Sequence, residues 1–114
     1  ATRYNRELSI VLMEIDRLAE INEAHSPETG NQILGQIAQL TMQMLRTNDI
    51  FARYDTTRFA IILPETTEDA ATTACEKIRQ KIETLDIKPP QSETDRISVT
   101  VTIAPSSSTM LIRR

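Results

Sequence analysis

Residues 49–66, DIFARYDTTRFAIILPET, decide which fold the sequence predicts. Within them, residues 50–54 and 59–63 are two short runs rich in isoleucine, phenylalanine and tyrosine, which are residue types that strands favour. A short polar connection separates the two runs, and this is the pattern of a β-hairpin. Pro64 ends the second run, because proline lacks the N–H that a sheet ladder needs. The other elements are placed before and after this hairpin.

Upstream of the hairpin the sequence predicts one strand and two helices. Residues 8–15 read LSIVLMEI and are apolar on both alternating faces, as in a central buried strand. Residues 17–24 form a short helical stretch. A second helix is expected to start with Ser26 as its N-cap and Pro27 in its first turn. It reaches Leu45, and its apolar stripe consists of Ile33, Ile37, Leu40 and Met44.

Downstream of the hairpin the sequence predicts a third helix and one or two strands. Thr66 or Thr67 is the expected N-cap of the helix, whose apolar face is formed by Ala71, Ala74, Ile78, Ile82 and Leu85. Residues 88–95 are a polar loop that contains proline. Apolar and polar residues alternate along 97–103, which predicts a strand with one face in water. A last short strand is expected at 110–112.

The predicted order of elements is therefore β-α-α-β-β-α-β. A hairpin inside an alternating pattern indicates an α/β (α+β) fold, with a mixed, largely antiparallel sheet of roughly four or five strands flanked by helices. Residues 8–15 are expected at the centre of the sheet, with the helix at 33–45 on one of its faces. The predicted core consists of Ile10, Leu12, Ile33, Ile37, Phe59, Ile61, Ile78, Ile82, Val99 and Val101.

Composition argues against several classes of function. The chain has 114 residues, enough for one domain with its own core, and its formal net charge of −3 argues against a nucleic-acid partner. Cys75 is the only cysteine and His25 the only histidine, which argues against a disulfide, a cysteine zinc site and a hydrolytic triad. No stretch approaches the roughly 20 apolar residues of a membrane span. We expect residues 1–114 to be one cytoplasmic domain of a longer protein, which could itself be membrane-anchored.

Four blocks along residues 6–104 resemble the GGDEF family of cyclic di-GMP signalling proteins. Residues 12–34, LMEIDRLAEINEAHSPETGNQIL, are similar to the family's LxxDIDxFKxINDxxGHxxGDxxL, and the hairpin is similar to DxxxRYGGDEFAIILPxT. CEKIRQKI at 75–82 and ISVTVTIA at 97–104 are similar to AExIRxxI and ITVSIGIA. The blocks follow one another in the family's order with nearly its spacing. The resemblance implies a fold like that of nucleotide cyclases and polymerase palms.

The resemblance also implies descent from diguanylate cyclases, in which two domains each hold one GTP and join them into cyclic di-GMP. That chemistry needs carboxylates to hold divalent metal on the triphosphate, and a glycine turn that lets the backbone approach the phosphates. Glu14 stands at one metal position of the family and is expected to pair with an arginine of the hairpin. The positions of the hairpin motif hold Asp55, Thr56, Thr57, Arg58 and Phe59. Both glycines and both hairpin carboxylates are replaced, so we expect a degenerate domain with no catalytic residue, no metal and no cofactor.

The family's guanine pocket is partly kept. Asn22 matches the pocket asparagine, whereas Asn31 replaces an aspartate that accepts hydrogen bonds from the guanine edge. An amide has one acceptor oxygen and donors of its own, so guanine selectivity is expected to weaken. The alternative for both residues is helix capping, which we expect for Asn31 and leave open for Asn22.

A third site of the family is kept in outline. Many members carry an RxxD motif before the hairpin, where cyclic di-GMP binds as a product inhibitor, and Arg46 and Asp49 match its spacing. At such a site arginine donates to phosphate or guanine, and aspartate accepts from guanine. The resemblance adds a basic residue from the following helix, which is Lys77 by position, with Arg79 nearby. The alternative is that Arg46 has no ligand and only interacts favourably with the dipole at the C-terminal end of its helix.

These features predict a catalytically inactive regulatory domain that acts as a cyclic di-GMP receptor. The alternatives are a dimerisation or protein-interaction module without a nucleotide ligand, and a residual GTP-binding regulator that works through Glu14, Asn22 and Asn31. The expected partners are cyclic di-GMP, other domains of the parent protein or a partner protein, and a second copy in a homodimer. Neither nucleic acid nor direct membrane insertion is expected. The family's C-terminal helix has no counterpart in residues 105–114, PSSSTMLIRR.

Overall fold

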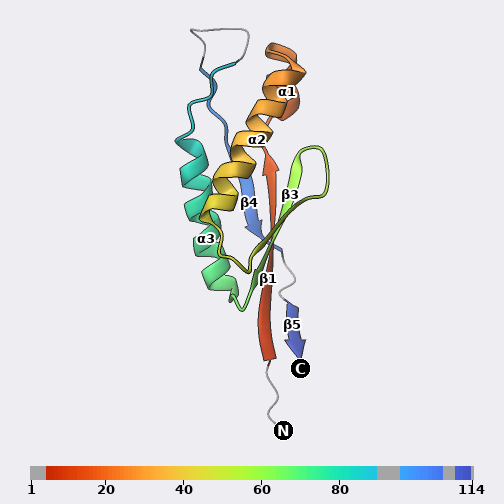
Figure 1. Cartoon of the computed structure of the whole chain (residues 1–114), viewed down its shortest axis with the longest axis vertical. Helices are drawn as coiled ribbons and strands as arrows, with labels where there is room; N and C mark the ends of the chain where they lie inside the picture. Colours follow the sequence, from red (N-terminus) through yellow and green to blue (C-terminus); the bar gives the residue numbers. More distant parts are fainter. Residues whose placement is uncertain (1–4, 90–95, 107–109, 114) are drawn as a thin grey trace.

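One antiparallel sheet carries the helices of the molecule (Figure 1). The computed structural model of the chain describes residues 5–89, 96–106 and 110–113. In chain order the elements are β1 (Asn5–Ile15), α1 (Leu18–Ala24), α2 (Pro27–Met44), β2 (Ile50–Arg53), β3 (Arg58–Pro64), α3 (Glu68–Glu83), β4 (Val101–Pro105) and β5 (Met110–Arg113). The predicted order is confirmed, with β5 as the last short strand.

β1 is the central strand, as predicted. The sheet order is β2-β3-β1-β4, and β5 pairs with the N-terminal part of β1. All of these pairings are antiparallel, and Val11 of β1 stands opposite both Ile61 of β3 and Pro105 of β4. β1 is 11 residues long, so β4 and β5 can share one of its edges. This order places the two candidate sites, the hairpin tip and the turn after β3, at opposite ends of β3.

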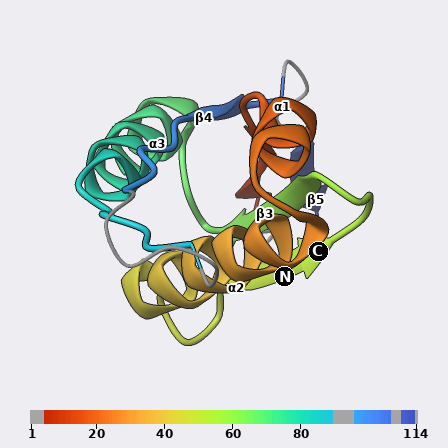
Figure 2. The same cartoon turned by 90° about the horizontal axis from the view of Figure 1, so that it is seen from above.

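The core lies between the sheet and helices α2 and α3, which share one side of the sheet (Figure 2). Alternate residues of β1, namely Val11, Met13 and Ile15, point into this core and are buried. From α2, Ile33 and Ile37 are fully buried, as predicted. The predicted core residues Phe59, Ile61, Ile78, Ile82, Val99 and Val101 are also buried.

Local sequence determines where α2 and α3 begin. Ser26 is the N-cap of α2, its Oγ accepts from the N–H of Thr29 at 3.3 Å, and proline follows in the first turn. Thr67 caps α3, with its Oγ1 accepting from the N–H of Ala70 at 3.1 Å. Thr66 does not cap and is buried. Its hydroxyl is therefore available for a contact at the cavity described below.

The prediction that Ile10 and Leu12 are buried is wrong. Ile10 is half-buried, and Leu12 is 43% exposed. Side chains alternate along a strand, so these two point away from the helices. The sheet face they occupy stays open among the described residues. The apolar run of β1 indicates a central strand correctly, but the described residues cover only the face that is turned toward the helices.

The strand predicted at residues 97–103 begins later than expected and ends at Pro105. β4 begins at Val101, while Ile97 forms an isolated bridge with Ile87. The predicted loop at 88–95 lies outside the described residues from 90 to 95. Within the part of the chain that the structure describes, none of the helices is long and apolar enough to cross a membrane.

Candidate functional site

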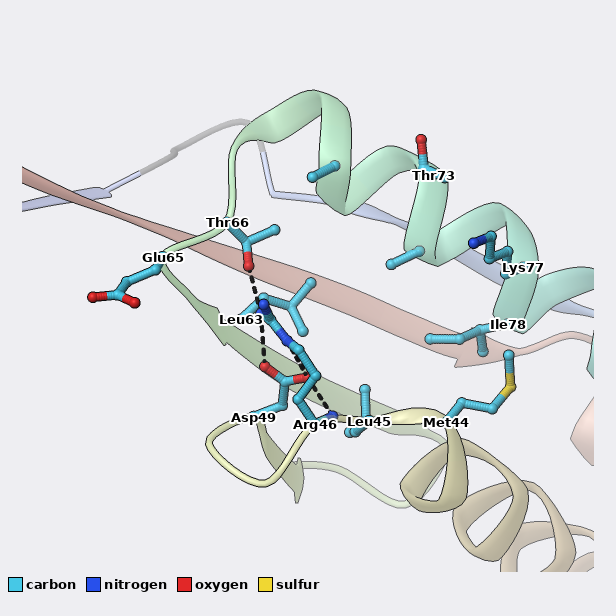
Figure 3. Close-up of a pocket in the computed structure, with 12 residues that line it drawn as sticks. Met44, Leu45, Arg46, Asp49, Leu63, Glu65, Thr66, Thr73, Lys77 and Ile78 are labelled. Carbon is cyan, nitrogen blue, oxygen red and sulfur yellow. Dashed lines mark hydrogen bonds and ion pairs between the residues drawn. The ribbon is translucent and has the colours of Figure 1, made fainter.

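A cavity of about 320 Å³ opens between the end of α2, the turn from β3 to α3, and α3 itself (Figure 3). It is lined by Met44, Leu45, Arg46, Asp49, Leu63, Glu65, Thr66, Ala70, Thr73, Ala74, Lys77 and Ile78. The structure therefore brings three of the four predicted ligand-binding residues, Arg46, Asp49 and Lys77, to one place.

The guanidinium of Arg46 connects two sides of this cavity. Its Nη2 donates to Asp49 Oδ1 at 3.0 Å, to the carbonyl oxygen of Pro64 at 3.1 Å and to Thr66 Oγ1 at 2.7 Å. Its Nε donates to Asp49 Oδ2 at 3.3 Å, so the arginine engages both carboxylate oxygens. Because Arg46 follows α2 while Pro64 and Thr66 precede α3, this one side chain fastens the end of one helix to the start of the other.

Asp49 is enclosed, whereas Arg46 is not. The side chain of Asp49 is 3% exposed, and its Oδ2 also accepts from the backbone N–H of Arg46 at 2.8 Å. The side chain of Arg46 is 61% exposed. The hydrogen bond and the negative charge of Asp49 raise the pKa of Arg46 above its ordinary value. Asp49 therefore holds the charged guanidinium of Arg46 in place, and Arg46 is the member of the pair that solvent or a ligand can reach.

Lys77 lines the cavity from α3, across from Arg46 (Figure 3). The wall between the two cations is apolar and consists of Met44, Leu45, Leu63, Ala70, Ala74 and Ile78. Cationic donors beside an apolar wall fit a ligand that combines negative charge with flat apolar surface.

Arg79 does not join the cavity. Its guanidinium forms ion pairs with Glu76 and with Glu83, the latter at 2.7 Å between Nη1 and Oε1. The hydrogen bond between Arg79 and Glu76 raises the pKa of Arg79 and lowers that of Glu76. Pairs of this spacing are ordinary on an exposed helix surface. The structure therefore separates Arg79 from the other three predicted ligand-binding residues.

The turn that completes the cavity was not found from the sequence. Glu65 has a left-handed φ of 52°, which residues other than glycine adopt infrequently. The carbonyl of Thr66 accepts from the buried Oγ of Ser9 at 2.8 Å, while its hydroxyl accepts from Arg46. The turn is thus held from β1 and from the end of α2. One signal lay in the adjacent threonines: when Thr67 caps α3, Thr66 is left for another partner.

The hairpin tip contains the predicted ion pair. Arg58 Nε lies 3.6 Å from Glu14 Oε2, and Arg58 Nη2 lies 3.4 Å from Asp55 Oδ2. Asp55 Oδ1 accepts from the N–H of Thr56 at 2.7 Å, and the carbonyl of Thr57 accepts from a backbone N–H of β1 at 3.2 Å. The two carboxylates of this region therefore share one half-exposed arginine.

Phe59, the last position of the hairpin motif, belongs to the core. It is 3% exposed, and its ring stacks on Phe51 with the centroids 4.8 Å apart. Asp16, which sequence reasoning did not single out, accepts from Thr100 Oγ1 and Thr102 Oγ1 at 2.7 Å each. This contact fastens the end of β1 to the start of β4.

Asn22 and Asn31 do not cap helices. Asn22 lies inside α1, whose C-cap is His25, and its buried Oδ1 has no hydrogen-bond partner among the described residues. It packs against Gly30, where an added Cβ would lie 2.0 Å from Oδ1. Asn31 is exposed within α2, which Ser26 caps, so the capping prediction for Asn31 is wrong.

A wider hollow of about 800 Å³ lies beside the end of β1 and the start of α1, with Glu14, Asp16 and Glu20 in its lining. Neither Asn22 nor Asn31 lines it. Within residues 5–89, 96–106 and 110–113, no three His, Cys, Asp or Glu side chains are grouped so that they could hold a metal ion.

The sheet order and the placement of the helices define a palm-like α+β domain, and comparison with known proteins identifies its family. The model of the family described as diguanylate cyclase, GGDEF domain, matches residues 1–111. The chain therefore belongs to the GGDEF family.

Relatives and a solved structure agree with this assignment. Diguanylate cyclase A of Treponema denticola is 31% identical over 100 residues, covering 88% of this chain and 26% of that protein. Diguanylate cyclase DosC of Escherichia coli is 29% identical over 101 residues, covering 89% of this chain and 22% of that protein. The chain thus spans about a quarter of the length of these curated relatives. The GGDEF domain of DgcB from Caulobacter crescentus, solved in complex with c-di-GMP, superposes with a TM-score of 0.79 at 21% identity, over 96% of this chain and 60% of that one, and shows the shared fold.

Proposed function

We propose that this chain is a catalytically inactive GGDEF domain that binds cyclic di-GMP in the cavity between α2 and α3. The proposal rests on Arg46, whose side chain is largely exposed while its guanidinium donates hydrogen bonds to Asp49 and Thr66. Lys77 lines the same cavity from the opposite side. Cyclic di-GMP combines two phosphates with two flat guanine rings. A site for it needs cationic donors beside an apolar surface, and this cavity supplies both.

The two cations and the aspartate have different roles in this proposal. Arg46 donates to a phosphate or to the acceptor edge of a guanine, and Lys77 supplies a second positive charge. The main role of Asp49 is to orient Arg46, because both of its carboxylate oxygens already accept hydrogen bonds from that residue. The cavity volume of about 320 Å³ is at the small end for ligand sites, so one domain is expected to bind in the micromolar range or more weakly.

The sequence and the hairpin geometry support the loss of cyclase activity. Thr57 and Arg58 stand where the family has carboxylates, and a guanidinium has no lone pair to offer a metal ion. The remaining acidic position, Glu14, is paired with Arg58. Such a domain would report cyclic di-GMP to the neighbouring part of a longer protein rather than make it.

The interaction module remains the second candidate, because the sheet face around Leu12 is apolar and open among the described residues. A residual GTP-binding regulator has less support. It would need Glu14, Asn22 and Asn31 to act together, yet Glu14 is paired with an arginine and the two asparagines do not share the hollow beside it.

Calorimetric titration with cyclic di-GMP and with GTP separates the three functions. The receptor predicts heat of binding with cyclic di-GMP and none with GTP. Binding of GTP alone would support the residual regulator. If neither ligand binds folded protein at high micromolar concentration, the receptor proposal is wrong and the interaction module takes its place.

A further inference from the structure

Thr66 connects the proposed ligand cavity to the central strand of the sheet. Its N–H donates to the Glu7 carbonyl at 3.3 Å, and its own carbonyl accepts from Ser9 Oγ at 2.8 Å. Its hydroxyl accepts from Arg46 Nη2 at 2.7 Å (Figure 3). Two of these contacts come from β1, and the third comes from the residue that follows the end of α2. Thr66 is therefore bonded to the strand on one side and to the arginine of the cavity on the other.

Ser9 is a buried polar residue in the part of β1 beneath this cavity. Its side chain is 1% exposed. In the strand register Ser9 stands opposite Leu63, so the two side chains share one face of the sheet, and Leu63 lines the cavity. A buried hydroxyl is costly unless it makes a hydrogen bond. Ser9 makes that bond to the Thr66 carbonyl, so its burial and the position of Thr66 depend on each other.

The turn that Ser9 holds is strained. Glu65, directly before Thr66, has a left-handed φ of 52°, which is unfavourable for a residue with a side chain. Such a conformation persists where the surrounding contacts hold it, and one hydrogen bond is comparable in free energy with the strain. Loss of the Ser9 hydroxyl is therefore expected to let the turn relax and to move Thr66 relative to Arg46.

Arg46 depends on this turn for the direction of its guanidinium. Asp49 accepts from Nε and Nη2 and so fixes one edge of the group. Nη2 also donates to the Pro64 carbonyl at 3.1 Å and to Thr66 Oγ1, which fixes its direction relative to α3. Among the described residues, these contacts leave Nη1 for a ligand. A shift of the turn therefore changes where that nitrogen points.

We propose that Ser9 is a positioning residue of the cyclic di-GMP site. It acts through Thr66 and holds the guanidinium of Arg46 where the ligand meets it. This inference rests on the proposed function of the cavity, and it extends the site to β1, which supplies none of the described lining residues. The affinity for the ligand then depends on a hydroxyl that the ligand does not touch.

Calorimetric titration of variants with cyclic di-GMP tests the proposal. Ser9→Ala should weaken the affinity about threefold or more, as expected for one lost hydrogen bond, whereas Ser9→Thr keeps the hydroxyl and should bind like wild type. Val101→Ala is the matched control, because Val101 is 4% exposed and stands opposite Ile15 at the other end of β1. Urea unfolding should show that Ser9→Ala and Val101→Ala both destabilise the protein, but only Ser9→Ala should change the affinity.

Two further measurements locate the effect at Arg46. The double variant Ser9→Ala/Thr66→Val should bind like Thr66→Val alone, because both changes act on the same link. In isotope-labelled protein without ligand, the NMR signal of the Arg46 Nε–H should shift in Ser9→Ala and stay in place in Val101→Ala. This second measurement reports on the position of the guanidinium independently of binding.

Several results would overturn the role of Ser9 while wild type still binds and the proposed function stands. They are equal affinity of folded wild type and Ser9→Ala, equally weakened binding by Val101→Ala or by Ser9→Thr, effects that multiply in the double variant, and an unchanged Arg46 signal in Ser9→Ala. No binding by folded wild type would instead overturn the proposed function, and this role of Ser9 with it. Should Ser9→Ala fail to fold, Ser9→Cys takes its place, because a thiol is a weaker donor than a hydroxyl.

Discussion

At the scale of single residues, Arg46 has two roles that one mutation would remove together. Its guanidinium braces the turn between β3 and α3, and its exposed edge is the proposed contact for cyclic di-GMP. The two roles can be separated at Thr66, whose uncharged hydroxyl accepts from Arg46. A change there alters the position of the arginine and keeps its charge.

We therefore predict that Thr66→Val weakens cyclic di-GMP binding several-fold. It should also lower the free energy of unfolding by about 1–3 kcal/mol, because it removes two hydrogen bonds: the one that the Thr66 hydroxyl accepts from Arg46 and the one that it donates to the Pro64 carbonyl at 2.9 Å. Calorimetry and urea unfolding measure the two effects. Thr72→Val is the control, because Thr72 makes its bond to the Glu68 carbonyl on the outside of α3. Unchanged affinity in Thr66→Val would mean that Arg46 is positioned without Thr66.

Cys75 allows a prediction about pH. Burial raises the pKa of its thiol to about 11 from an ordinary value of 9.0. The folded state therefore keeps its proton at pH values where the unfolded state loses it. The contribution to stability is complete below about pH 9 and is lost as the pH rises toward about 11. Urea unfolding should show that the free energy of unfolding of wild type, taken relative to that of Cys75→Ala, decreases as the pH rises over this range. A constant difference would contradict the burial-raised pKa.

At the scale of elements, the two glycines of α2 have opposite surroundings. Gly30 is buried against Asn22, and an added Cβ would lie 2.0 Å from its Oδ1. Gly35 is exposed, and an added Cβ would meet nothing within 4 Å. Both sit inside the helix, so the gain in helix propensity on changing glycine to alanine is the same for both.

Gly35→Ala is therefore predicted to stabilise the protein by roughly 0.5–1 kcal/mol. Gly30→Ala is predicted to destabilise it by about 1 kcal/mol, because Asn22 must leave its place. Thermal and urea unfolding of the two variants measure the contrast. Combining Gly30→Ala with Asn22→Ala should recover most of the loss, and equal effects of the two glycine changes would contradict the packing of α1 against α2.

The hairpin and the central place of β1 could be predicted from sequence because turn chemistry and apolar alternation are local signals. The exposure of Leu12 could not, since it depends on whether another segment covers that face. The late start of β4 could not be predicted either, because Ile97 and Val99 are buried as strand residues would be, yet the regular strand begins only at Val101. The spacing of Arg46 and Asp49 in the sequence predicted that they belong to one site. The contact of Arg46 with Thr66 could not be predicted, because it depends on the turn at Glu65, for which the sequence has no recognisable pattern.

At the scale of the whole molecule, the two faces of the sheet differ among the described residues. The cavity between α2 and α3 lies on the side of the sheet that carries the helices, whereas the exposed side chains of Leu12 and Ile50 lie on the other side. The hairpin tip belongs to that second side, because Glu14 and Arg58 stand in the register next to Leu12 and Ala60. The proposed ligand cavity and the hairpin tip are therefore separate places in the fold.

This arrangement predicts no conversion of GTP to cyclic di-GMP with Mg²⁺ or Mn²⁺. The physical reason is that Thr57 and Arg58 cannot supply the metal-binding carboxylates, and without them the developing charge on the triphosphate is not neutralised. Chromatographic separation of nucleotides after long incubation at high protein concentration is the measurement. Steady turnover that disappears in Glu14→Ala would contradict the prediction.

The central claim is that cyclic di-GMP binds at Arg46, and calorimetric titration of wild type, Arg46→Ala and Thr57→Ala tests it most directly. Removing the charge-assisted contact of Arg46 costs roughly 1.5–3 kcal/mol, which weakens affinity about tenfold or more. Thr57→Ala, at the other end of β3, should leave the affinity unchanged. Lys77→Ala should also weaken binding, while Lys81→Ala, outside the cavity lining on the same helix, should not. Equal affinity of folded wild type and folded Arg46→Ala, or no binding by wild type at high micromolar ligand, would contradict the account.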